Sequence, residues 1–268
     1  MTKARAGWTV AACATLLCAG IALPAHAKRC PPDSVQVGQL CVDTYEASVW
    51  SIPATSTRLI KKVQNGKAVL ADLTGGGATQ ISLTSSCTPA FPGTFPANGH
   101  WTAPLYAVST PGVQPTVCVT WFQAEQACRL SGKRLPTNQE WQAAVAGSPD
   151  PGADNGTTDC NTASAVHAVD TGSRSNCVSS WGAFDMVGNV DEWVADWVPL
   201  STDCPGWGTF SNDFQCFAGA STVVHNGPGA LVRGGHFFGG PCGPLTINGG
   251  FQPSASSSGI GFRCARNP

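Results

Sequence analysis

The chain has 268 residues, of which only 12% are charged, and it contains 31 glycines, 20 prolines and 13 cysteines. Its formal charge of −1 argues against a nucleic-acid surface and against attraction to anionic membranes. So few charges with so much glycine and proline exclude a helical bundle and favour a loop-rich fold.

The first 27 residues have the layout of a secretory signal peptide. Lys3 and Arg5 give a basic start, an apolar stretch runs from Trp8 to Leu23, and the small residues of Ala25-His26-Ala27 suit cleavage. The alternative is an N-terminal membrane anchor, although the stretch is shorter than the roughly 20 residues that a span needs. We expect an exported protein, periplasmic or extracellular, with one mature domain over 28–268 and no membrane span in it.

The cysteines predict a disulfide framework. Cleavage removes Cys13, Cys18 and two cations, which leaves 11 of the 13 cysteines and a formal charge of −3, from 13 basic and 16 acidic residues. Such cysteine density in an exported chain is typical of disulfide bonding. The odd count means that at least one thiol is free or pairs between chains. Closeness in sequence favours the pairs Cys30–Cys41 and Cys160–Cys177.

The first half of the mature chain offers one clear strand. Residues 39–46 partly alternate between apolar and polar, as a half-buried strand does. Residues 51–116 hold Thr/Ser clusters, three consecutive glycines and several prolines. We expect short strands and long surface loops over that stretch.

Two helices follow, each with its own start and stop signals. Each begins with a threonine that has a Gln or Glu three residues later, which is the capping-box pattern, and each ends at a glycine. The two helices are expected from Thr120, with Gln123, to Gly132 and from Thr137, with Glu140, to Gly147.

The remaining chain is mostly loop. Residues 148–180 and 199–230 are loop-like, and we expect two strands around a Gly/Ser-rich excursion between Val232 and Cys264. Lys133-Arg134 is interpreted as a solvated corner between the helices. The tryptophans interpreted as core residues are Trp121, Trp141, Trp193 and Trp197.

Several segments, in this order, resemble one family. They are Cys41-Val-Asp-Thr-Tyr-Glu46, Val119 to Cys128 with Gly132 to Trp141, Gly182 to Trp193, and Arg233-Gly-Gly235 with Gly261-Phe-Arg-Cys264. Together they resemble the sulfatase-modifying-factor family, whose best-known members are the formylglycine-generating enzymes. The match covers most of residues 41–265 and is poor over 49–115 and 199–230.

The resemblance implies an α+β fold that is a loop-rich variant of the C-type-lectin-like fold, with little regular secondary structure. It also implies the bridge Cys128–Cys264, since the family pairs the cysteine that ends the first helix with the one in the terminal GFRC. The pairing of five cysteines stays open: Cys87, Cys118, Cys204, Cys216 and Cys242.

Residues 185–192 resemble the family's calcium loop. The matching ligands are the side chains of Asp185 and Glu192 and the backbone carbonyls of Gly188 and Val190. Oxygen ligands of this kind suit calcium, and a glycine lets the backbone turn inward. The alternative is that the carboxylates cap a turn and face solvent. The family's second calcium loop is not recognisable in this sequence, and Asn161 is the only position that matches it, weakly.

The loop after Arg233-Gly-Gly235 departs from the family pattern. Formylglycine-generating enzymes place two cysteines there, five positions apart, and their thiolates bind the copper(I) ion that activates oxygen; soft thiolates suit this ion. Here Gly239 and Pro244 stand at those positions, and Cys242 is the only cysteine between Arg233 and Cys264.

Two hypotheses follow. The first is a calcium-stabilised binding or structural module without formylglycine-generating activity, with an unknown protein, peptide or glycan ligand. The second is an oxidoreductase of the same fold, with altered copper or iron chemistry around His236 and Cys242. For these two residues, the plainer interpretation is a histidine bonded to the backbone and a cysteine in a disulfide.

Overall fold

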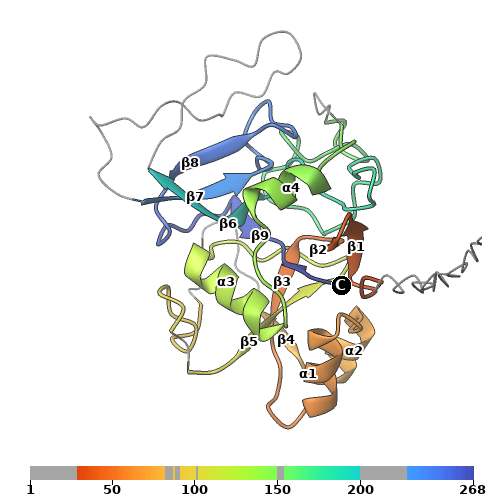
Figure 1. Cartoon of the computed structure of the whole chain (residues 1–268), viewed down its shortest axis with the longest axis vertical. Coiled ribbons are helices and arrows are strands. Elements are labelled where there is room, and N and C mark those ends of the chain that lie inside the picture. Colours follow the sequence, from red (N-terminus) through yellow and green to blue (C-terminus); the bar gives the residue numbers. More distant parts are fainter. Residues whose placement is uncertain (1–28, 82–86, 88–90, 101, 150–153, 200–227) are drawn as a thin grey trace, which may run out of the picture.

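Three small sheets, four helices and long connecting loops make up the described part of the protein (Figure 1). The computed structural model describes residues 29–81, 87, 91–100, 102–149, 154–199 and 228–268. The signal-peptide prediction therefore lies outside the described residues. Within those ranges, no helix has both the length and the apolar character to cross a membrane.

The first two sheets have three strands each. One has the order β1–β2–β10, with β1 (Ser34–Val37), β2 (Leu40–Asp43) and β10 (Ala265–Arg266) all antiparallel. The other has the order β4–β3–β5, with β3 (Ala47–Ser51) between β4 (Thr79–Ile81) and β5 (Leu105–Ser109). The first sheet brings the C-terminal end of the chain back beside the first strands, and it confirms a strand within residues 39–46.

The third sheet positions several residues of the candidate site, among them Glu192 and Arg233. Its order is β8–β7–β6–β9, with β6 (Asp191–Pro199), β7 (Pro228–Arg233), β8 (Ile247–Phe251) and β9 (Ile260–Phe262). Strand β6 is antiparallel to β7 and parallel to β9, so that Glu192 has Arg233 on one side and Gly261 on the other. After β7 ends at Arg233, β8 and β9 lie on either side of residues 252–259, which are rich in serine, so the expectation of two strands around a Gly/Ser-rich excursion before Cys264 is confirmed.

The two predicted helices are confirmed. Helix α3 (Trp121–Leu130) and helix α4 (Asn138–Ala144) each begin with a complete capping box. In α3 the Thr120 side chain accepts from the Gln123 N–H at 3.2 Å, and the Gln123 side chain accepts from the Thr120 N–H at 3.0 Å. Capping depends only on neighbouring residues, so it is readable from the sequence.

The expectation for residues 51–116 was wrong at two places. Helix α1 (Thr57–Gln64) and helix α2 (Leu70–Gly75) stand where short strands and loops were expected, and Figure 1 shows them together at the lower end of the molecule. Leu59 and Val63 are one helical turn apart and both are buried. They join a hydrophobic cluster that also contains Leu73 and Trp50 from β3.

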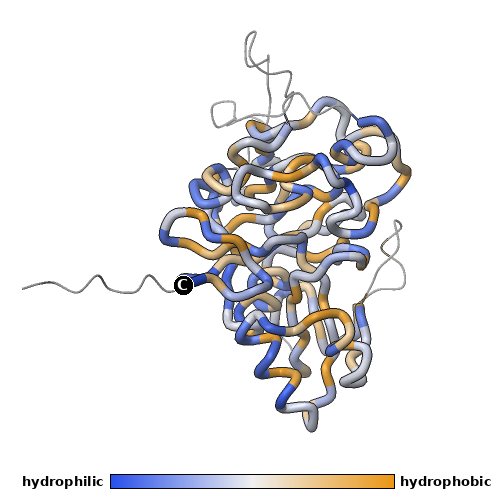
Figure 2. Tube along the Cα trace, turned by 90° about the vertical axis from the view of Figure 1, so that its right-hand side faces the viewer, coloured by the Kyte–Doolittle hydropathy of each residue, from blue (hydrophilic) through white to orange (hydrophobic). Residues whose placement is uncertain are grey.

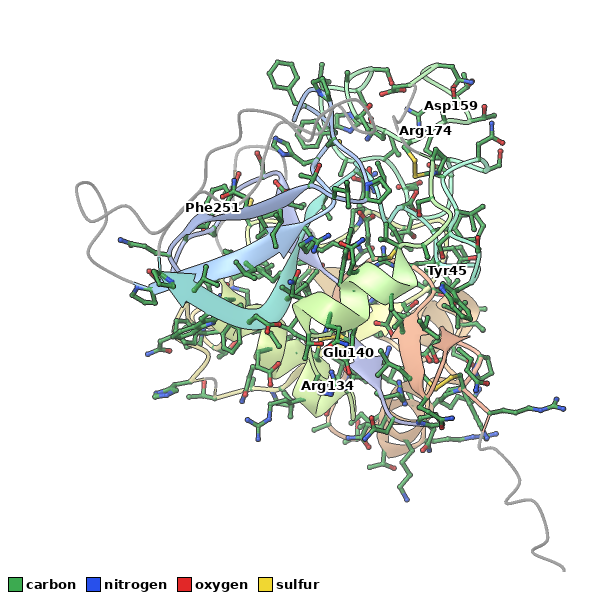
Figure 3. The ribbon with its side chains drawn as sticks, turned by 45° about the horizontal axis from the view of Figure 1, so that its top comes forward. Tyr45, Arg134, Glu140, Asp159, Arg174 and Phe251 are labelled. Atoms are coloured by element: carbon green, nitrogen blue, oxygen red, sulfur yellow. A yellow bond between two sulfur atoms is a disulfide. The ribbon has the colours of Figure 1, made fainter. Side chains whose placement is uncertain are left out.

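The interpretation of Lys133 as a solvated residue was also wrong. Its ammonium is buried and lies 2.6 Å from both Asp33 and Asp43. These carboxylates are distant in sequence, so the local pattern gave no sign of them. Arg134 does lie at the surface, where it pairs with Glu140 at the start of α4 (Figure 3).

The tryptophan interpretation holds for the centre of the molecule only. Trp141 and Trp193 are fully buried in two separate core clusters. Trp121 is partly buried, and Trp197 is 43% exposed at the far end of β6, so the core assignment of Trp197 was wrong.

Figure 2 shows hydrophobic and hydrophilic stretches alternating over short distances along the described chain.

Four disulfides are present in the described chain, with sequence separations from 11 to 136. The three expected bridges Cys30–Cys41, Cys128–Cys264 and Cys160–Cys177 are present, and a fourth joins Cys87 to Cys118. Cys204 and Cys216 lie outside the described residues, and Cys242 is buried. Bridges of this number are typical of proteins outside the cytoplasm.

The Cys87–Cys118 bridge is expected to be the first to be reduced. Both residues have left-handed backbones, with φ of 56° and 63°, and such a conformation costs a non-glycine residue about 1–3 kcal/mol. Cys87 is also partly exposed. Mass spectrometry after graded treatment with glutathione should show alkylated Cys87 and Cys118 first.

The matched control is Cys30–Cys41, which also has one partly exposed cysteine but lacks left-handed residues. Earlier or equal labelling of Cys30 would contradict the assignment of backbone strain to Cys87–Cys118.

Candidate functional site

The loop that leads into β6 folds tightly because several of its residues adopt left-handed conformations. Asp185, Gly188 and Asn189 have φ of 57°, 73° and 59°. A side chain at Gly188 would begin 2.4 Å from the backbone oxygen of Asn161, so a glycine is required there. Residues 185–192 therefore close against the loop that holds Asn161.

Glu192 is the most heavily bonded carboxylate of this loop. Its Oε1 accepts from the Arg263 Nε at 2.8 Å and Nη2 at 2.6 Å, and its Oε2 accepts from the Arg263 Nε and the Trp141 Nε1, both at 2.7 Å. All three side chains are buried. The single Nε–H of Arg263 is shared between the two oxygens, so three N–H groups in all hold the Glu192 carboxylate.

Asp185 is different, because one of its oxygens is left without a partner. Its Oδ2 accepts from the Gly172 N–H at 2.7 Å, while Oδ1 accepts no hydrogen bond from the described residues. Asp185 is only 1% exposed, and burial raises the pKa of this carboxyl to about 6. A buried oxygen in this condition is open to a bound cation or water.

A second buried carboxyl, Glu46, lies close to the loop. It accepts from the Asn189 side chain at 2.6 Å and from the Val190 N–H at 3.1 Å. Burial, together with the negative charges of Asp185 and Glu192, raises the pKa of Glu46 well above its usual value. The region thus holds three buried carboxyl groups, those of Asp185, Glu192 and Glu46, around the guanidinium of Arg263.

These contacts decide how well the predicted calcium ligands fit. The solvent-facing alternative is wrong, because Asp185 and Glu192 are both buried. Asp185 fits a cation, since its Oδ1 is open, and Gly188 and Val190 could contribute carbonyls. Glu192 fits less well, because calcium would have to share oxygens that Arg263 and Trp141 already engage.

The turn after β7 keeps the family's arginine but lacks its thiol pair. Arg233 donates to the Thr246 and Pro244 carbonyls at 2.9 Å, and its guanidinium lies 4.4 Å from the Trp141 ring centroid. These contacts tie the end of β7 to residues 244–246 and to helix α4. Gly239 and Pro244 carry no thiol at the two family positions.

Cys242 lies directly under this turn. A side chain at Gly235 would begin 2.7 Å from the Cys242 Sγ, and Cys242 is only 2% exposed. The structure packs this sulfur within the first core cluster, which also contains Trp141 and Leu231. No group of three or more His, Cys, Asp or Glu side chains among the described residues is arranged to hold a metal ion.

His236 is bonded to a carboxylate that the sequence did not single out. Its Nδ1 lies 3.0 Å from the Oδ2 of Asp191, which is buried, and this hydrogen bond raises the pKa of His236. The backbone-bonded interpretation of His236 was wrong in this respect. Sequence reasoning missed Asp191, Arg263 and Glu46, although all three stand inside the quoted motifs.

The loop-rich α+β fold, the left-handed backbone at Gly188, Gly234 and Gly235, and the Cys128–Cys264 bridge agree with the fold that the sequence resemblance implies. A model of the sulfatase-modifying factor enzyme 1-like domain matches residues 96–268. The chain belongs to this family.

Relatives in the family include enzymes and a protein named as inactive. The formylglycine-generating enzyme of Streptomyces coelicolor is 28% identical over 200 residues, which is 63% of this chain and 58% of that protein. The inactive C-alpha-formylglycine-generating enzyme 2 of Bos taurus is 27% identical, over 56% of this chain and 50% of its own. The chain thus spans about half the length of these curated relatives.

Among solved structures, PvdO from Pseudomonas aeruginosa is similar, with a TM-score of 0.39 and 17% identity over 85% of this chain and 80% of that one.

The buried Arg263–Glu192 pair is expected to dominate the stability of the site. Replacing Arg263 with Met leaves Glu192 charged and buried without its partner, which costs about 3–5 kcal/mol. Urea unfolding of the oxidised protein measures this change. The double variant Arg263→Met/Glu192→Leu should be more stable than Arg263→Met alone.

The matched control is Arg134→Ala. It breaks the half-exposed Arg134–Glu140 pair, for which a loss of only about 0–1 kcal/mol is expected. Equal losses for the two single variants would mean that burial of the Arg263 pair carries no special weight.

Proposed function

We propose that the protein is an exported binding or structural module of its family that does not generate formylglycine. The observation that carries this proposal is the loop after Arg233. That loop keeps the family's backbone turn but has Gly239 and Pro244 where the two copper-binding cysteines are expected. Two thiolates are the soft ligand pair that copper(I) prefers, and the single cysteine of this loop, Cys242, does not replace them.

The cysteines nearest in sequence do not supply such a pair. Cys264 is bonded to Cys128, and Cys242 is buried beneath Gly235. The retained arginine has a structural explanation, because Arg233 holds the carbonyls of Pro244 and Thr246 and packs on Trp141. Retention of the turn therefore does not require retention of the chemistry, and a relative named as inactive supports this interpretation.

The oxidoreductase hypothesis receives less support. It needs His236 and Cys242 to act on one metal ion or one proton. Instead, His236 is bonded to Asp191 and lines a surface pocket, whereas Cys242 is part of the first core cluster. The geometry therefore favours the binding module.

The proposal predicts that the mature protein does not convert cysteine to formylglycine. The experiment incubates the copper-loaded mature protein with a sulfatase-derived cysteine peptide in air, and mass spectrometry follows the peptide. The Streptomyces coelicolor enzyme, treated in the same way, is the positive control. Conversion by this protein at a rate within about tenfold of the control would contradict the proposal.

Export is proposed from the N-terminal pattern and is supported by the four disulfides. Its direct check is N-terminal sequencing of the mature protein, which should begin at Lys28.

Calcium is proposed as a stabilising ion. Asp185 Oδ1 and the carbonyls of Gly188 and Val190 would hold it, and Glu192 would add at most a shared oxygen. The ion would stabilise the charged form of the Asp185 carboxyl, which burial disfavours, and would leave the loop more rigid.

Calcium is therefore expected to raise the melting temperature. A ligand at about 100 times its Kd adds about 2.7 kcal/mol, which corresponds to a shift of about 5–10 °C for a domain of this size. Differential scanning calorimetry with 1 mM calcium or 1 mM EDTA measures the shift. Asp185→Asn should abolish most of it, whereas Asp159→Asn, a change outside the loop, should leave it intact.

If calcium does not shift the melting temperature of the unaltered protein, or shifts that of Asp185→Asn fully, the proposal that this loop binds calcium is contradicted.

A further inference from the structure

A surface pocket of about 370 Å³ lies beside the turn that follows β7. None of the proposed calcium ligands lines it, although its His236 is hydrogen-bonded to Asp191 in the same segment. The residues that matter for its chemistry are Val166, His236, Phe238, Ser257, Ser258 and Gly259. The volume is at the lower end of the range for small-molecule sites, about 300–1,000 Å³.

Two walls of the pocket are apolar and open to solvent. Val166 and Phe238 are 81% and 75% exposed, which makes them the most exposed large apolar side chains among the described residues. They are more than 70 positions apart in the sequence, yet they line the same pocket. Their neighbour Phe237 is buried and packs edge-on against His236, so the exposure of Phe238 is not a general property of this turn. Clustered exposed apolar side chains of this kind mark a binding site.

The imidazole of His236 is held on two sides. Its Nδ1 is bonded to the buried Asp191, and a side chain at Gly259 would begin 2.7 Å from its Cδ2. Only glycine can therefore lie against this face of the ring. With Nδ1 engaged, Nε2 is the ring nitrogen that remains for a ligand in the pocket.

The charge of the pocket favours one class of ligand. Among the described residues of its lining, His236 is the one ionisable side chain, and the Asp191 carboxylate behind it favours the imidazolium form. A ligand carboxylate could accept from Nε2–H and from the hydroxyls of Ser257 and Ser258, which are strong, charge-assisted contacts. An ammonium group would find no carboxylate among the described lining residues.

We propose that this pocket binds a small carboxylate that carries an apolar group, such as an aryl or alkyl carboxylic acid. The carboxylate contacts His236, and the apolar group contacts Phe238 and Val166. This assignment rests on the proposed function, because it gives the binding module its ligand class.

The test uses phenylacetate as the probe, with phenylacetamide and phenethylamine as matched compounds that keep the ring and change the charge. Ligand-observed NMR on the mature protein should give a Kd on the order of 1 mM for phenylacetate, as expected for a ligand of this size. The amide and the amine should bind at least about tenfold more weakly.

Variants locate the binding. Phe238→Ala alters an exposed residue, so it should fold normally and weaken binding of phenylacetate about fivefold or more. His236→Gln should abolish it within the measured range. Trp181→Ala removes an exposed aromatic side chain elsewhere on the surface and should leave binding unchanged.

Equal binding of all three compounds, binding that survives both His236→Gln and Phe238→Ala, or no binding of phenylacetate at about 20 mM would overturn the assignment. These outcomes are separate from the formylglycine assay. If phenylacetate fails and no formylglycine forms, the pocket assignment fails while the binding-module proposal stands. If formylglycine forms, the proposed function fails whatever the pocket binds.

Discussion

The site depends on one buried ion pair, between Arg263 and Glu192. The guanidinium follows β9, its carboxylate partner belongs to β6, and Trp141 of α4 donates to the same carboxylate. Arg263 also donates to the Asp43 and Phe184 carbonyls, at 3.0 and 2.8 Å. A buried charge is stable only when all its partners are in place. This pair therefore requires β9, residues 185–192 and helix α4 to assemble together.

What the sequence predicted about the fold was local or family-based. Capping boxes at Thr120 and Thr137 depend on residues three apart, and both helices were found where they were expected. The family resemblance supplied the Cys128–Cys264 pairing, which no local rule gives. Helix α1 was missed because the surrounding Thr, Ser, Gly and Pro residues suggested loops, although the spacing of Leu59 and Val63 was a usable signal.

The site was predictable to a lesser degree, because its chemistry depends on contacts across long sequence distances. The burial of Lys133 follows from Asp33 and Asp43, which lie about 90 to 100 positions away. Glu192 was recognised as a candidate ligand in residues 185–192, but its hydrogen bonds with Arg263 and Trp141 join residues that are distant in sequence. His236 was recognised as a candidate, whereas its partner Asp191, on β6, was not.

The loop after Arg233 keeps the turn expected of the family but lacks the cysteine pair that its copper chemistry uses. Arg233 and Trp141 maintain the turn by hydrogen bonds and cation–π contact, while Gly239 and Pro244 supply no thiolate. The most direct test is a competition titration of the oxidised mature protein with copper(I) against a chromophoric chelator. The account predicts no stoichiometric copper(I) binding. One copper(I) ion bound per chain, with two Cu–S bonds seen by X-ray absorption, would contradict it.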